Sequence, residues 1–270
     1  MFKGLPLSLA FLALPTFAAP QLLTEIKAGD VWLQSEISQY DSDIEYKNPN
    51  NGLNTKESYT EDSLSFTSRI AIDADLSFTP LFGFKLENEN KDGDEDAQLI
   101  KASVGGIKKT SKNKTMTMLV SYENSDNVDE TRSSFEIDTR FQTSDVTSQY
   151  YNEVMLALAV PKDEGGSEGG SNLIVSNTVK FSVNSLMDVA LNTGVTLFED
   201  RTLTDDQTKI EFDPLFTLGA KLAFNLAPEF TLSLTAVKGF NKSQANYASG
   251  TKVDFDQDAS LLGVSFFGRF

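Results

Sequence analysis

Apolar and polar residues alternate along nearly the whole chain after residue 30, with a period of two. Residues 63–73, SLSFTSRIAID, have one mainly polar phase and one apolar phase, which holds Leu64, Phe66, Ile70 and Ile72. Successive side chains of a β-strand point to opposite faces, so this alternation is typical of strands with one apolar and one polar face. Because helical spacing of apolar residues is scarce, the pattern predicts an all-β protein.

The alternation recurs in about twelve segments, each near the length that a tilted strand needs to cross a bilayer. The predicted strands are residues 30–40, 63–73, 76–86, 98–108, 115–123, 134–142, 146–160, 173–184, 187–197, 212–224, 230–236 and 252–270. Their connections alternate in kind. Short connections are predicted near 74–76, 109–114, 143–146, 184–187 and 225–229. Longer, acidic or Gly-rich ones are predicted at 41–62, 87–97, 123–133, 161–172, 199–209 and 240–251.

Short turns on one side and long loops on the other are typical of an up-and-down barrel in an outer membrane. Hydrocarbon offers no hydrogen-bond partner to the backbone, so spanning strands must form a sheet without edges. A soluble β-sandwich alternates too, but soluble strands usually have about five or six residues, fewer than predicted here. We therefore predict a transmembrane antiparallel up-and-down β-barrel of about 12 strands, with short periplasmic turns and long extracellular loops.

The last residues, SLLGVSFFGRF at 260–270, continue the alternation to the final phenylalanine. This ending resembles the C-terminal assembly signal of Gram-negative outer-membrane β-barrels, with Gly268 where such proteins often carry an aromatic residue. The resemblance implies the outer membrane of a Gram-negative bacterium, outer-membrane lipid and lipopolysaccharide as surroundings, and closure of the last strand against the first. It also implies recognition by the barrel-assembly machinery through Leu262, Val264, Phe266 and Phe270.

The first residues are typical of a secretory signal peptide. MFK supplies a positive start, LPLSLAFLALP an apolar stretch, and Thr16-Phe17-Ala18 a small-residue cleavage site. A membrane anchor would need roughly 20 apolar residues, more than this stretch has. We predict a signal peptide at 1–18 and a single barrel domain at 19–270.

The amino-acid composition limits the kinds of catalysis and binding that the chain can support. The chain has no cysteine and no histidine, and its formal net charge is −16. Ser-His catalysis lacks its base, and the acidity makes nucleic acid an unsuitable partner. We predict no enzyme activity and no cofactor. The acidic loop ENENKDGDEDA, 87–97, lacks the ordered ligand spacing of an EF-hand, so a solvated loop is favoured and no metal site is predicted.

If the apolar phase faces lipid, the charged residues of the other phase point into the lumen. Charges of both signs in a water-filled pore select permeants, whereas paired charges would fill a narrow barrel. For Arg69 and Arg140 both interpretations stay open. The predicted pore-lining residues are Glu36, Arg69, Lys85, Glu136, Asp138, Arg140, Glu153, Lys180, Asp188, Asp213 and Lys221.

These features predict a porin-like channel for passive diffusion of small hydrophilic solutes. Acidic loops raise the local cation concentration at the mouth, so a mild cation preference is expected. Two alternatives remain. One is an oligosaccharide-specific porin, and the other is a non-conducting structural barrel whose loops bind a surface partner.

Overall fold

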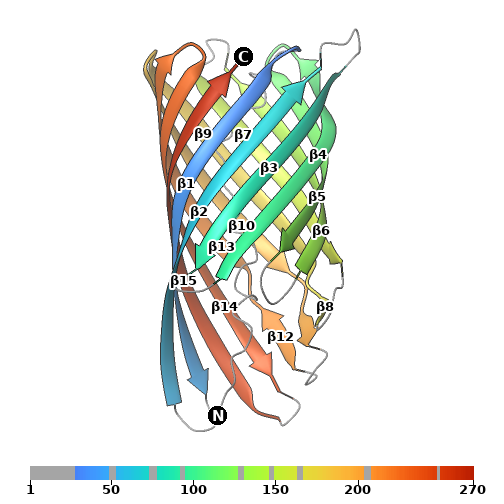
Figure 1. Ribbon diagram of the computed structural model, residues 1–270, viewed down its shortest axis with the longest axis vertical. Coiled ribbons are helices and arrows are strands. Elements are labelled where there is room, and N and C mark those ends of the chain that lie inside the picture. The colour runs from blue at the N-terminus through green and yellow to red at the C-terminus, as the bar shows by residue number, and fades with distance from the viewer. Residues whose placement is uncertain are drawn as a thin grey trace.

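Twelve antiparallel strands form a closed barrel in the computed structural model (Figure 1). The structure describes residues 28–48, 53–72, 78–91, 95–126, 131–145, 149–162, 167–203, 208–247 and 250–270. The barrel strands are β1 (Val31–Asn48), β2 (Leu53–Ala71), β3 (Thr79–Lys91), β4 (Glu95–Ser111), β5 (Lys114–Asp126), β6 (Thr131–Ser144), β7 (Tyr150–Lys162), β9 (Asn172–Asn184), β10 (Met187–Phe198), β13 (Leu215–Ala227), β14 (Phe230–Asn246) and β15 (Lys252–Arg269). The prediction of an all-β barrel of about 12 strands is confirmed.

The first and last strands close the barrel. β1 pairs with β15 from Trp32 opposite Arg269 to Lys47 opposite Asp254. The backbone groups of Val31 and Phe270 add two hydrogen bonds of 2.9 Å at the end of this seam. Since each strand is paired on both sides, the wall has no open edge, as a hydrocarbon surrounding requires.

Large apolar side chains cover the outer surface of the wall. The exposed fraction of Ile37 is 65%, and similar exposure recurs on every barrel strand, including Phe66, Phe84, Val104, Val120, Phe135, Leu156, Phe181, Leu191, Leu218, Leu234 and Val264. Such an apolar surface is costly in water. It is the surface expected of a barrel that contacts lipid, and it accounts for the apolar phase of the sequence.

The strands extend well into several of the predicted loops. The predicted loop at 41–62 is wrong for most of its length, because β1 and β2 continue as a paired hairpin to Asn48 and Leu53. The segments predicted as loops at 87–97, 123–133 and 240–251 likewise contain strand ends. Polar side chains occupy both faces of the β1–β2 extension, so backbone pairing continues where the alternation ends.

Three short strands missing from the prediction continue the sheet beside β14. They are β8 (Ser167–Gly169), β11 (Arg201–Leu203) and β12 (Lys209–Phe212). β12 pairs with β14, β11 with β12, and β8 with β11. Together with the long strands β1, β2, β14 and β15, they reach the lower end of Figure 1. The short turns and the C-terminus lie at the upper end.

The predicted signal peptide at 1–18 lies outside the described residues. No helix in the described part of the chain is long and apolar enough to cross a membrane.

Candidate functional site: the barrel interior

Ten of the eleven predicted pore-lining residues lie on the strand phase opposite the apolar outer surface. They are Glu36, Arg69, Lys85, Glu136, Asp138, Arg140, Glu153, Lys180, Asp188 and Lys221. Asp213 does not join them. It lies exposed between β12 and β13, and its backbone carbonyl accepts a 2.7 Å hydrogen bond from the Asn241 side chain.

The inward charges on β3 to β7 are held in ion pairs. Arg140 lies at the centre, with distances of 2.6 Å to Asp138 and 3.2 Å to Glu153. Gln142 donates a further hydrogen bond to Glu153. Because these groups satisfy one another, Arg140 has the arrangement expected of a structural cation.

Lys101 forms ion pairs across neighbouring strands. It lies 3.0 Å from Glu136 and 3.6 Å from Glu123. These pairs and those of Arg140 cross-link β4 to β7 from the inside. A separate pair, Lys85 at 2.5 Å from Glu87, lies within β3.

Apolar side chains fill the interior near the short turns, on the side of β1 to β5. A buried cluster joins Trp32, Ala71, Leu81, Ile107, Leu119 and Phe267. The ring centroids of Trp32 and Phe267 lie 5.4 Å apart in an edge-to-face arrangement. Leu81 is only 1% exposed. This part of the interior is therefore packed as in a soluble core.

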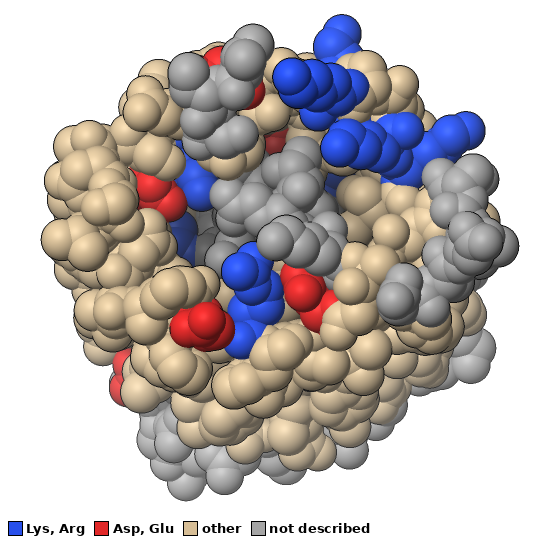
Figure 2. Space-filling model, turned by 90° about the horizontal axis from the view of Figure 1, so that it is seen from above, with Lys and Arg blue, Asp and Glu red and all other residues tan. Residues whose placement is uncertain are grey.

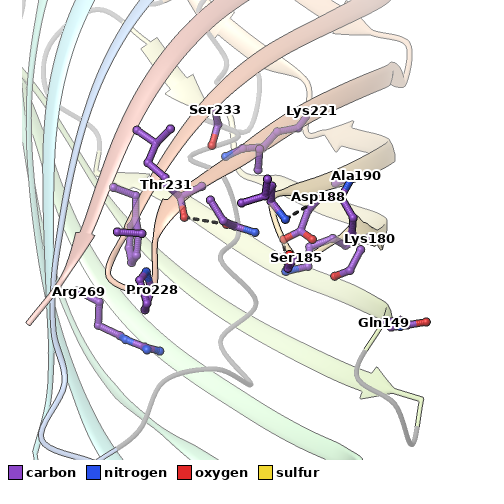
Figure 3. Close-up of a pocket in the computed structure, with 18 residues that line it drawn as sticks. Gln149, Lys180, Ser185, Asp188, Ala190, Lys221, Pro228, Thr231, Ser233 and Arg269 are labelled. Carbon is purple, nitrogen blue, oxygen red and sulfur yellow. Dashed lines mark hydrogen bonds and ion pairs between the residues drawn. The ribbon is translucent and has the colours of Figure 1, made fainter.

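The opposite side of the interior holds a cavity of about 770 Å³ (Figure 3). Its walls come from β9, β10, β13 and β14, with contributions from the end of β15. Lys180 and Asp188 form an ion pair of 3.1 Å there. The polar lining includes Ser182, Asn184, Thr231, Ser233, Lys221 and Arg269.

Basic residues mark the short-turn end of the barrel. The β4–β5 hairpin carries four exposed lysines, Lys108, Lys109, Lys112 and Lys114. Figure 2 looks onto this end and shows basic side chains gathered at one side of the rim. The sequence analysis predicted acidic long loops and no basic rim. The run IKKTSKNK, residues 107–114, overlaps the predicted short connection at 109–114 and could have indicated it.

Charged pairs stabilise the extended hairpin at the other end. Asp43 on β1 accepts a 2.5 Å hydrogen bond from Ser58 and lies 2.9 Å from the Lys56 ammonium. The hydrogen bond from Ser58, and then that from Lys56, lower the pKa of the Asp43 carboxyl below its ordinary value.

The described residues contain no group of three or more acidic, histidine or cysteine side chains that could hold a metal ion. Residues 92–94 of the predicted acidic loop lie outside the described part of the chain. The interior therefore offers ion pairs, polar groups and packed apolar side chains as its chemistry.

Several interior residues were missed by the sequence prediction. Lys101 lies between the outward Ile100 and Ala102, so the period of two was enough to find it. Glu87 falls at the end of β3, in a segment predicted as a loop. The apolar cluster was missed because Leu81 and Leu119 stand on the polar phase, next to apolar neighbours that mask the alternation.

The predicted assembly signal lies on the outer surface of β15. Leu262, Val264, Phe266 and Phe270 are all exposed. At Gly268, a Cβ atom would meet the Phe270 ring at 3.0 Å and the Phe230 ring at 3.3 Å. A side chain at 268 would therefore require these rings to shift.

Comparison with known proteins gives matches in structure only. No protein-family model matches the chain, and no curated protein matches it in sequence. The COG4313 outer membrane channel from Pseudomonas putida F1 has a TM-score of 0.61 at 12% identity, over 91% of this chain and 97% of that protein. A Pseudomonas aeruginosa FadL homologue has a TM-score of 0.54 at 8% identity, over 89% of this chain and 90% of that one.

A third solved structure, the KdgM porin, has a TM-score of 0.43 at 8% identity, over 84% of this chain and 97% of that one. A TM-score this low does not support a structural relationship with that porin. The two stronger matches, at such low identity, concern architecture alone. The chain has the closed twelve-stranded barrel fold found among outer-membrane proteins.

Proposed function

We propose that this protein is an outer-membrane channel for the passive diffusion of small hydrophilic solutes. The observation that carries the proposal is the cavity beside β9, β10, β13 and β14, whose lining includes charged and hydroxyl side chains. A barrel that served only to display loops would gain stability by packing this side as it packs the Trp32 cluster. Solutes would be filtered by the width left between the packed side and the cavity wall, and by the inward charges.

The proposal includes a location and partners. The protein would reside in the outer membrane of a Gram-negative bacterium, surrounded by outer-membrane lipid and lipopolysaccharide and inserted by the barrel-assembly machinery. The apolar outer belt and the exposed, alternating end of β15 support this location. Diffusion needs no cofactor and no energy source.

The charge balance supports a mild preference for cations. The net charge is −16, and the carboxylates of Asp41, Asp43 and Asp62 follow the extended hairpin of β1 and β2 at the end opposite the basic rim. Acidic groups at a mouth concentrate cations from solution. Most inward cations are held in ion pairs, which weakens the alternative of a pore that draws acidic oligosaccharides along a basic lumen.

Recording in planar lipid bilayers tests the proposal. The refolded mature chain should give stable conductance steps in potassium chloride, and the reversal potential in a salt gradient should have the sign of cation preference. A correctly folded barrel, shown by a gel mobility that changes on boiling, that stays silent would contradict the channel. Silence would support the second candidate, a structural barrel, which the packed Trp32 cluster favours.

A further inference from the structure

The ammonium group of Lys221 is buried and unsatisfied. Its Nζ atom has no hydrogen-bond partner among the described residues, although Lys221 lines the cavity of about 770 Å³. Removing an ammonium group from water without a partner is costly. The Lys221 ammonium is therefore available to pair with a ligand that the described residues do not supply.

The neighbouring strands leave room beside this ammonium. In the register of the sheet, Ala190 on β10 lies directly opposite Lys180 on β9 and Lys221 on β13. Neighbouring strands are about 4.8 Å apart, so the two lysine backbones are separated by about 10 Å. The small alanine between them forms a notch in the wall, with a basic side chain on each side (Figure 3).

The cavity lining as a whole carries more basic than acidic residues. Lys180, Lys221 and Arg269 line the cavity, and Asp188 is the one acidic residue among its lining residues. Asp188 is already paired with Lys180 at 3.1 Å. Lys180 also lies over the Tyr151 ring, 4.8 Å from its centroid, which fixes its position.

One further carboxylate acts on Lys221. Glu36 on β1 interacts with it electrostatically from outside the cavity lining. The Glu36 carboxylate accepts a 3.0 Å hydrogen bond from Gln34, and no hydrogen bond joins it to Lys221. Glu36 therefore offsets part of the charge of Lys221 and leaves its three donors unused.

We propose that Lys221 is the anchor of a binding site for a small hydroxylated carboxylate within the cavity. A lysine ammonium is a compact point charge that suits one negative group. The hydroxyls of Ser182, Thr231 and Ser233 and the amide of Asn184 suit the hydroxyl groups of such a solute. The volume is in the range of small-molecule sites, about 300–1,000 Å³. This site deepens the proposed channel function and rests on it, because it gives the diffusion path a point of recognition.

The test is a ligand-observed NMR titration of gluconate against the folded barrel in detergent. Gluconate carries one carboxylate and several hydroxyls, and glucitol is its uncharged counterpart. The wild-type protein should bind gluconate measurably and glucitol at least tenfold more weakly. Lys221→Gln should weaken gluconate binding about tenfold or more, as expected for loss of a charge-assisted hydrogen bond. Lys221→Arg should retain most of it, because the charge remains.

Lys242→Gln is the matched control. Lys242 lies on the extension of β14, with a side chain 73% exposed and away from the cavity, so gluconate binding should not change. Each variant is first shown to fold by its gel mobility before and after boiling. Equal binding by wild type and Lys221→Gln, or equal binding of gluconate and glucitol, would overturn the site.

The binding assay does not depend on conductance, so the two proposals fail separately. Lys221-dependent gluconate binding by a barrel that stays silent in bilayers would retain the site and contradict the channel. Conductance steps without Lys221-dependent binding would retain the channel and contradict the site.

Discussion

The two sides of the barrel interior use the same inward strand phase in opposite ways. On the side of β1 to β7, salt bridges surround Arg140 and an apolar cluster surrounds Trp32. On the side of β9 to β14, a cavity of about 770 Å³ separates the side chains, and the Lys221 ammonium has no hydrogen-bond partner among the described residues. One side of the interior is therefore cross-linked and packed, and the other keeps space.

Four substitutions test this difference. In each case stability means the free energy of unfolding, measured by urea titration of the folded barrel in lipid vesicles.

Arg140→Met should give the largest loss of stability. The change leaves the carboxylates of Asp138 and Glu153 buried without their cation. Removing one partner of a buried pair costs about 3–5 kcal/mol. Adding Glu153→Gln to Arg140→Met should recover part of the loss, because one uncompensated charge is removed. A loss below about 1 kcal/mol would show that the network does not hold this side together.

Leu81→Ala should open the packed side. Leu81 is almost fully buried beside Trp32, and a buried Leu→Ala change costs about 2–5 kcal/mol because a void remains. The single-channel conductance should rise or become noisier, since the void joins the lumen. Leu218→Ala, at an outward position of β13 that is 59% exposed, is the control and should leave conductance unchanged. Equal effects of both changes would contradict the packed interior.

Ala223→Phe should narrow the open side with little loss of stability. Ala223 lines the cavity between Asp188 and Ser233 in the sheet register, so a phenyl ring has room to enter. We expect conductance to fall several-fold while stability changes by about 1 kcal/mol or less. Ala220→Phe places the same ring at an exposed, outward position on the same strand and should leave conductance as in the wild type. Blockage by both variants alike would place the path elsewhere.

Asp43→Asn should have the smallest effect, and only at some pH values. The pKa of Asp43 is lowered by Ser58 and Lys56, so its ionised form favours the folded state above the ordinary pKa of 3.8, and this contribution is lost as the pH falls through the lowered value. The variant should therefore lower the urea midpoint slightly at pH 7 and match the wild type near pH 2. A difference that persists at low pH would assign the effect to packing.

Much of the fold followed from the period of two. One face of each strand is apolar, so Ile37, Phe66 and Val264 indicate both the strand and the side that faces outward. Beyond the apolar belt this pattern ends. The outer parts of β1 and β2 carry polar residues on both faces, and only backbone pairing defines them, which the sequence does not display.

The interior was predictable by phase and not by partner. The period placed Arg140 and Lys221 on the inward side, yet their different environments depend on which side chains the folded strands bring beside them. Arg140 meets Asp138 on its own strand and Glu153 on the next. Lys221 lies opposite the small Ala190 on β10, and no hydrogen bond or ion pair to it is formed by the described residues. Strand register and the shape of the lumen decide which inward charges are paired, and neither can be read from one sequence.

The seam between β1 and β15 has a mechanical consequence. It continues without a register break up to Lys47 opposite Asp254, far along the long hairpins. Hydrogen-bonded pairing between two strands opens first at the end that is exposed to water. In a membrane, the part of the seam outside the lipid would open first, while the part inside the lipid stays paired. An opening at the hydrated end could then close again before it reaches the part of the seam that closes the barrel.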